Sequence, residues 1–285
     1  MQDLNGNRDW RIIESDQMAD SFLSTSLNAD VSLRLCSVRC KEAQIETAPN
    51  QDYARVVFAE QTSTLSFCVC DGVGGSFQGN FAAKYLATQV TEYLMALPAI
   101  PRHSHKVALQ LREQLKIWTV AAQQELRQTS LSPNIPTLEQ EILAEQREQH
   151  GSATVFFCGR VDFASSNRVR ISHKLPALFC WMGNVTARVF TAAQKCEPLG
   201  DLQNDRNRWS TSSGQQGTLT VRVSALHKHE PLLIHTDGLD ELSQHLALFN
   251  DKQLQHNIWQ RLSLPTNDDM TVLEFRWAAS RRSPA

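Results

Sequence analysis

The order of hydrophobic and polar residues along the chain predicts a block of strands, then long helices, then a second block of strands. Residues 31–37 alternate between apolar and polar, the pattern of a strand with one buried face. Residues 54–59 and 65–70 are short apolar runs joined by a polar stretch, which indicates a hairpin. Residues 1–30 are mostly polar, so we expect an N-terminal extension with one helical piece over residues 10–22.

Apolar residues then recur every three or four positions, the period of a helix with one buried face. This pattern predicts a helix over residues 80–97, ended by nearby prolines, and a second helix over residues 106–128. A third, highly charged helix is expected over residues 138–150. Later in the chain, a short helix is expected near Leu239 and a longer one over residues 251–262.

The rest of the chain is predicted to be mainly strands. These cover residues 153–161, 169–173, 177–181, 186–190, 219–223, 231–236 and 270–277, with an irregular polar stretch over residues 198–217. Short turns between strands imply antiparallel sheets, and helices between the strand blocks imply sheets covered by helices. We therefore expect an α+β fold with a single domain over residues 31–278, followed by a tail over residues 279–285.

Composition narrows the classes of partner and location. The chain has 285 residues, of which 41% are hydrophobic, enough for a sizeable core. Its 28 basic and 30 acidic residues give a net charge of −2, so neither nucleic acid nor an anionic membrane is expected as a partner. No apolar run approaches the roughly 20 residues of a membrane span. Residues 1–8 lack the apolar core of a signal peptide, which favours a cytoplasmic location.

The seven cysteines form no C-x-x-C pair. Cys68 and Cys70 lie two apart on a predicted strand and therefore face the same side. The simpler interpretation is that the cysteines are reduced and act as small hydrophobic residues in the core. A disulfide or a redox switch is the alternative.

Aspartates stand at the ends of several predicted strands, although these strands are far apart in sequence. They occur in the segments Asn50-Gln51-Asp52, Asp71-Gly72-Val73-Gly74-Gly75, Asp237-Gly238 and Asp268-Asp269. Each segment alone is weak, because an Asp-Gly pair is first of all a turn signal. Carboxylates that converge in space repel one another unless a cation lies between them, and oxygen ligands select hard ions such as Mg²⁺ or Mn²⁺. The pattern suggests a metal-dependent hydrolase.

Taken together and in this order, the segments resemble the metal-dependent serine/threonine protein phosphatases of the type 2C family, including their bacterial branch. The resemblance spans about residues 31–278. It rests on Pro49-Asn50-Gln51-Asp52, Phe67-Cys68-Val69-Cys70-Asp71-Gly72-Val73-Gly74-Gly75, Gly151-Ser152-Ala153-Thr154, Trp181-Met182-Gly183-Asn184, Leu232-Leu233-Ile234-His235-Thr236-Asp237-Gly238-Leu239 and Asn267-Asp268-Asp269-Met270-Thr271-Val272.

The resemblance implies a four-layer α-β-β-α sandwich with two Mn²⁺ or Mg²⁺ ions at one end of the sheets. Asp71 then bridges both ions, the carbonyl of Gly72 binds one of them, and Asp237 and Asp268 complete the other site. Asp52 acts mainly through ordered water. Catalysis depends on Asp71, Asp237 and Asp268, because a hydroxide bridging the ions attacks phosphorus.

The same resemblance implies a substrate class and a partner. The expected reaction is hydrolysis of phosphoserine or phosphothreonine in proteins, as part of signalling in a bacterial cell, opposed by a cognate serine/threonine kinase. The glycines at 72, 74 and 75 are expected where the backbone must approach the ions closely and a Cβ would obstruct it.

Two positions depart from the family pattern. Asn184 stands where many members carry an aspartate that helps to bind a third metal ion, so either a third ion is weak or absent here, or Asn184 only holds a turn. The family usually has an arginine that grips phosphate shortly before the first acidic segment. Arg39 is the candidate for that role, with a solvated loop charge as the alternative.

Two other functions remain open. A phosphatase fold that has lost turnover would serve as a binding or regulatory module, which Asn184 favours and the retained aspartates oppose. A dinuclear hydrolase of small phosphoesters has the same set of ligands, although the order of the segments argues against it.

Overall fold

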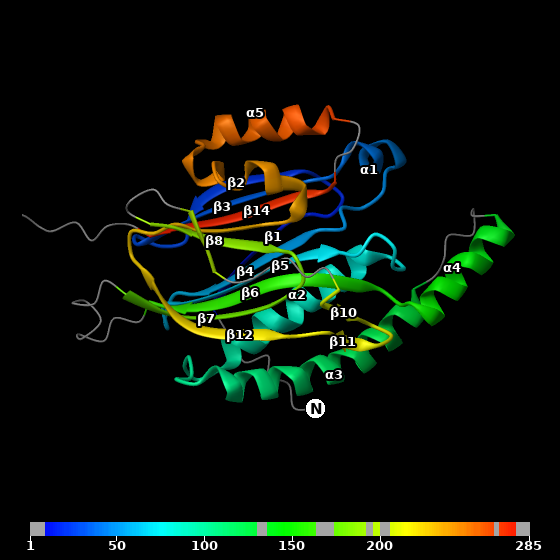
Figure 1. Cartoon of the computed structure of the whole chain (residues 1–285), viewed down its shortest axis with the longest axis horizontal. Coiled ribbons are helices and arrows are strands. Elements are labelled where there is room, and N and C mark those ends of the chain that lie inside the picture. The colour runs from blue at the N-terminus through cyan, green and yellow to red at the C-terminus, as the bar shows by residue number, and fades with distance from the viewer. Residues whose placement is uncertain are drawn as a thin grey trace, which may run out of the picture.

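Two antiparallel sheets lie face to face, with helices on their outer faces (Figure 1). The computed structural model describes residues 9–129, 136–163, 174–191, 196–199, 206–264 and 268–277. Within these ranges, eight strands form the first sheet (sheet A) and six form the second (sheet B). The layers confirm the α+β fold and the α-β-β-α order expected from the sequence.

Sheet A is built around a run of strands that follow one another in the chain. Its strands are β1 (Trp10–Glu14), β4 (Tyr53–Ala59), β5 (Thr64–Gly72), β6 (Ala153–Asp162), β7 (Lys174–Met182), β10 (Arg208–Ser210), β11 (Gly214–Gln216) and β12 (Thr220–His227). The order runs β1-β4-β5-β6. Strand β6 also pairs with β7 and β10, and β12 lies on the far side of β7.

Sheet B brings together strands from both ends of the chain. In spatial order they are β2 (Ser21–Ser26), β3 (Val31–Val38), β14 (Met270–Trp277), β13 (Leu232–His235), β8 (Thr186–Phe190) and β9 (Cys196–Pro198). The last long strand of the chain thus lies between β3 and β13, which closes the domain.

Helices cover both outer faces. Helices α2 (Gly79–Ala96) and α3 (Ser104–Gln128) lie on sheet A, and α4 (Thr137–Gln149) projects beyond it (Figure 1). Helix α5 (Asp251–Leu262) and the short 3₁₀ helices η1 (Asp237–Leu242) and η2 (Leu246–Leu248) lie over sheet B. None of the helices in the described ranges is long and apolar enough to cross a membrane.

Apolar side chains fill the spaces between these layers. Between the sheets, Phe67 of sheet A meets Phe275 of sheet B with ring centroids 5.0 Å apart. The helical period predicted for α2 and α3 is confirmed, because Leu86 and Leu115 are fully buried against the outer face of sheet A. Truncating a buried aromatic residue such as Phe67 to alanine typically costs about 3–5 kcal/mol.

The expectation of a helix over residues 10–22 is wrong. The segment forms β1 and β2, an edge strand of each sheet, with β1 paired to β4 and β2 paired to β3. Strands of five and six residues carry little periodic signal, and pairing with a neighbour decides their conformation. The residues expected to be an N-terminal extension thus extend both sheets.

Other differences are small. The six-residue helix α1 (Lys41–Glu46), capped by the Cys40 side chain, was not predicted, and neither were the three-residue strands β9 to β11. The strand expected over residues 169–173, part of the irregular stretch (residues 200–205) and the tail lie outside the described residues.

All seven cysteines are free thiols, in agreement with the simpler interpretation. Cys68, Cys158 and Cys180 face one another across three neighbouring strands of sheet A and are fully buried. Cys70 lies two residues from Cys68, with the two sulfur atoms 3.5 Å apart. They pack with the apolar residues under α2 and α3.

This burial predicts selective reactivity towards a thiol-alkylating reagent. In the native protein only the partly exposed Cys40 and Cys196 should react, because the reagent cannot reach a thiol buried in the core. Mass spectrometry of the alkylated protein, with a denatured sample as control, measures this pattern. Rapid modification of Cys68 or Cys158 in the native protein would contradict it.

Candidate active site

The strand register brings the predicted aspartates to one end of the sandwich. In sheet A, Tyr53 lies opposite Cys70, so Asp52 before β4 and Asp71 at the end of β5 are at the same end. In sheet B, His235 lies opposite Val272, so Asp237 after β13 and Asp268 before β14 share one end as well.

A threonine joins the two sheets at this end. The Thr236 hydroxyl donates a 2.7 Å hydrogen bond to Asp52 Oδ2, and the Thr236 hydroxyl oxygen accepts a bond from the Thr271 backbone N–H at 3.0 Å. Thr236 lies on sheet B next to Asp237, whereas Asp52 precedes a strand of sheet A. The bond therefore orients Asp52 and fixes the distance between the two acid-bearing sheet ends.

Hydroxyl groups of the Gly151-Ser152-Ala153-Thr154 segment hold the neighbouring backbone. The Thr154 hydroxyl donates to the Asp71 carbonyl at 2.7 Å. The Ser152 hydroxyl donates to the Gln78 carbonyl at 2.6 Å and accepts from the Ala82 N–H at 3.0 Å. These bonds tie the end of β5 and the start of α2 to β6, so the segment supports the site without lining it.

Mutual electrostatic influence shows that the acids form one cluster. The pKa of Asp71 is raised well above the usual 3.8, first by burial and then by the negative charges of Asp237, Asp268 and Asp269. Burial and the charge of Asp71 likewise raise the pKa of Asp52. Burial and Asp268 raise the pKa of Asp237. Each carboxylate is therefore in a position where negative charge is disfavoured unless a cation is present.

Asp269 belongs to the cluster although sequence analysis gave it no role. Its carboxylate accepts hydrogen bonds from the Cys40 N–H at 2.7 Å and the Gln51 N–H at 2.6 Å, and its side chain is buried. It thus joins the start of β14 to the loops before α1 and β4. Its position directly after Asp268 was the available signal, but only the fold shows which of the two points inward. Asp268 is exposed, but it lies close enough for its charge to raise the pKa of Asp71 and of Asp237.

Asn184 lies directly against the cluster. Its Nδ2 donates to Asp237 Oδ2 at 3.1 Å, and this bond favours the charged form of Asp237. Asp240, also unpredicted, is close enough for Asp237 to raise its pKa, after the larger effect of burial. An amide group therefore lies beside Asp237, where a further carboxylate would add to the repulsion.

The glycine at 72 is required for backbone packing. A Cβ there would lie 2.6 Å from the Gly79 carbonyl carbon and 2.8 Å from the Gln51 carbonyl oxygen. At Gly75 nothing lies within 4 Å of such a Cβ, and at Gly74 the Gln51 side chain lies 3.9 Å away. At Gly72 the close approach is therefore between neighbouring backbone segments. The turn at Gly74 and Gly75 leaves space around the backbone.

The donors suit a hard divalent ion. All the converging groups offer oxygen. The Gln51 side-chain oxygen lies close to Gly79 and Gly74; it is buried and has no hydrogen-bond partner among the described residues. Within the described ranges, however, no three acidic, histidine or cysteine side chains surround a common point closely enough to hold an ion as they lie. The cluster fits a cation in charge and in donor type.

Arg39 points away from the acids. Its Nε lies 3.8 Å from an Asp20 carboxylate oxygen, and its Nη1 donates to the Ala48 carbonyl at 3.4 Å. Its backbone is nevertheless next to Cys40, which bonds Asp269. A role in gripping phosphate would require the guanidinium to leave Asp20.

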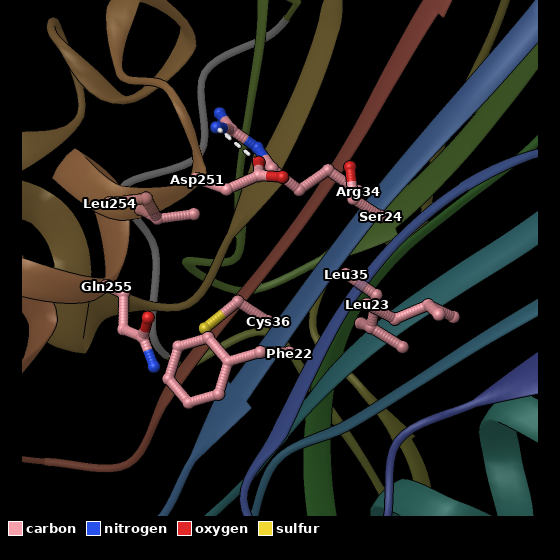
Figure 2. Close-up of a pocket in the computed structure, with 9 residues that line it drawn as sticks. All are labelled: Phe22, Leu23, Ser24, Arg34, Leu35, Cys36, Asp251, Leu254 and Gln255. Carbon is pink, nitrogen blue, oxygen red and sulfur yellow. Dashed lines mark ion pairs between the residues drawn. The ribbon is translucent and has the colours of Figure 1, made fainter.

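A separate groove lies between α5 and the β2–β3 edge of sheet B (Figure 2). Phe22 and Cys36 lie at one end of it, and Asp251 faces the Arg34 guanidinium at the other, with Nη1 and Oδ1 3.6 Å apart. Arg34 also donates to the Phe249 and Leu246 carbonyls. The guanidinium also pairs with the buried Glu274 carboxylate of β14. Arg34 thus attaches η2 and α5 to sheet B, and among the described residues the groove presents no group arranged for catalysis.

Comparison with known proteins identifies the fold. No protein-family model matches the sequence, and no curated protein sequence matches it. Among solved structures, a variant of a bacterial serine phosphatase aligns with a TM-score of 0.60 at 16% identity, covering 88% of this chain and 100% of that one. The fold is that of the bacterial serine/threonine phosphatases.

Two further solved structures agree. The serine/threonine phosphatase Stp1 from Staphylococcus aureus aligns with a TM-score of 0.59 at 15% identity, covering 90% of this chain and 98% of its own. The catalytic domain of the serine/threonine protein phosphatase PstP, solved with two manganese ions, aligns with a TM-score of 0.55 at 13% identity, covering 88% and 99%. Such identities show a shared fold, and the chemistry has to be argued from the residues of this chain.

The raised aspartate pKa values predict how stability depends on pH without metal. The folded protein holds protons that the unfolded chain releases, so this stabilisation is fully present below the usual pKa of 3.8 and is lost as pH rises through the raised values. Denaturant unfolding of chelator-treated protein should therefore give a lower free energy of unfolding at pH 8 than at pH 5.

The variant Asp71→Asn is the matched control, because it removes one of the repelling charges while keeping size and shape. Its loss of stability between pH 5 and pH 8 should be smaller than that of the unchanged protein. An equal loss in both proteins would show that the cluster does not cause the dependence.

Proposed function

We propose that this protein is a divalent-metal-dependent phosphatase that hydrolyses phosphoserine or phosphothreonine in proteins. The observation that carries the proposal is the convergence of Asp52, Asp71 and Asp237 at one end of a phosphatase fold, where each raises the cost of charge on its neighbours. A fold alone does not imply an activity, but this arrangement of acids suits few purposes other than holding cations.

Each residue has a separate part in the proposed site. Asp71 and the carbonyl of Gly72 would hold ions from the sheet A side, and Asp237 and Asp268 from the sheet B side. Asp52, fixed by Thr236, would act through water. Divalent ions bound there would neutralise a phosphate dianion and activate water for attack. We assign Asp71, Asp237 and Asp268 as the residues whose loss abolishes turnover.

The substrate and partner follow from the same proposal. The open space beside Gly75 suits a phosphorylated side chain presented by another protein, and a serine/threonine kinase would supply that substrate. Arg39 stays a candidate for binding phosphate only if its guanidinium leaves Asp20. A cytoplasmic location within a bacterial signalling system is part of this proposal.

A regulatory module without turnover is the second candidate, favoured by one observation. Asn184 donates to Asp237 where an acidic residue is expected in an active relative, so a third ion has one ligand fewer. The four retained aspartates favour the enzyme.

Activity should depend on Asp71 and on metal. Asp71→Asn should lower Mn²⁺-dependent release of phosphate from a phosphothreonine peptide by at least about 1,000-fold, because a neutral amide is a poor replacement for a carboxylate that two cations would share. Chelator should abolish release by the unchanged protein. Asp30→Asn, an exposed aspartate in the turn between β2 and β3, is the control and should be fully active.

The three candidate functions give different results in this assay. Chelator-sensitive release from the peptide supports the proposal, and release only from p-nitrophenyl phosphate indicates a hydrolase of small esters. Binding of metal or phosphopeptide without release indicates the regulatory module. Near-normal activity of the Asp71 variant would refute the proposed site.

Asn184→Asp tests the departure at that position. Without metal, the change replaces a donor to Asp237 by a second charge, so the melting temperature should fall by a few degrees. With Mn²⁺, calorimetry should detect an additional weak site. An unchanged number of bound ions would mean that Asn184 only holds the turn before β8.

A further inference from the structure

The segment that joins β1 and β2 crosses from one sheet to the other at the end that carries the acids. We call residues 15–20 the crossover segment. Strand β1 is the edge of sheet A beside β4, and β2 is the edge of sheet B beside β3. The crossover segment therefore contacts the chain on both sides of the site.

Gln17 lies at the centre of this segment and bonds two of the backbone elements that form the site. Its Nε2 is 3.0 Å from the Asn50 carbonyl oxygen, 3.4 Å from that of Asp52 and 3.0 Å from that of Asn80. Its own carbonyl accepts the Asn50 N–H at 2.7 Å. One half-buried side chain thus connects the loop that carries Asp52 to the first turn of α2.

The ends of the crossover segment are fixed independently of Gln17. The Ser15 N–H donates to the Ala54 carbonyl at 2.9 Å, and the Ser15 hydroxyl accepts the Ala54 N–H at 3.0 Å. Asp20 Oδ1 accepts the Arg39 N–H at 3.2 Å. Removing the Gln17 amide therefore leaves the crossover segment attached and withdraws only the donor to the three carbonyls.

These contacts complement those on the other side of Asp52. Thr236 from sheet B holds the Asp52 carboxylate, whereas Gln17 holds the Asp52 backbone. The first turn of α2 matters as well, because Gly79 packs against Gly72, directly after Asp71. Gln17 thus bonds the Asp52 backbone directly and reaches Asp71 indirectly, through the first turn of α2 and Gly72.

We propose that Gln17 is a positioning residue, which holds the backbone of Asp52 and the start of α2 so that the aspartate cluster can take up its divalent ions. The inference rests on the proposed function of that cluster. It gives the N-terminal strands a role in the site as well as in the sheets.

Metal binding without substrate tests this role. Gln17→Met keeps the length of the side chain and removes the donor, and it should weaken Mn²⁺ binding in calorimetry by roughly tenfold, the lower end of the range for residues that orient metal ligands. In the phosphopeptide assay, the Mn²⁺ concentration for half-maximal activity should rise similarly, and kcat should recover at saturating Mn²⁺.

Two controls separate positioning from general effects. Gln61→Met makes the same substitution at an exposed glutamine that bonds Asp9 near the β4–β5 turn, away from the acids. Arg11→Met removes the bonds from β1 to Thr25 and Ser26 of β2, and so loosens the same N-terminal strands away from the site. Both should bind Mn²⁺ like the unchanged protein.

If Gln17→Met does not fold, Gln17→Asn takes its place in the test. This variant shortens the side chain by one methylene and so withdraws the amide.

The outcomes are distinguishable. If the unchanged protein binds no Mn²⁺, the proposed function fails and this inference fails with it. If it binds Mn²⁺ and the Gln17 variant binds equally well, only the inference is overturned. An equal loss of affinity in Arg11→Met would also overturn it, because the effect would then come from general loosening.

Discussion

The repulsion among carboxylates at one end of the two sheets is the constraint on which the rest of the structure depends. In a poorly solvated environment, like charges a few ångströms apart disfavour each other by several kcal/mol, and the chain brings at least four of them together. The surrounding bonds oppose the separation that this repulsion favours. Thr236 links the two sheets by its hydrogen bond to Asp52. The Asp269 carboxylate accepts hydrogen bonds from two backbone amides, and the Thr154 hydroxyl bonds the end of β5.

This arrangement also explains the chemistry of the immediate neighbours. The groups that bond the carboxylates of Asp52, Asp237 and Asp269 are neutral donors: the Thr236 hydroxyl, backbone amides and the Asn184 side chain. Neutral donors orient a carboxylate without cancelling its charge, whereas an arginine at the same place would compete with a cation. Arg39, which is close in sequence to the first acid, directs its guanidinium to Asp20 instead. The net negative charge is thus preserved for an incoming cation.

Sequence could identify the acids because each follows or precedes a strand, and the register of antiparallel strands then fixes where it lies. The helices α2, α3 and α5 were predictable for a similar reason, since their apolar residues repeat with one period. No local sequence pattern distinguishes Asp269 from Asp268 or indicates a role for Gln17. Their roles arise from hydrogen-bond partners between about 30 and 230 positions away in the chain. Strands β1 and β2 were misassigned for the same reason: their conformation depends on β4 and β3, and their own sequences are too short to decide it.

The position of the N-terminal strands has a consequence for solubility. Strand β4 is buried along its whole length, whereas three of the five residues of β1 are exposed. With β1 in place, the edge strand of sheet A is short and carries the charged side chains of Arg11 and Glu14. Short, charged edge strands discourage pairing with strands of other molecules. A chain beginning at residue 31 would expose β4 as an apolar edge strand instead. It would be prone to self-association through that strand even if the positions of the aspartates were unchanged.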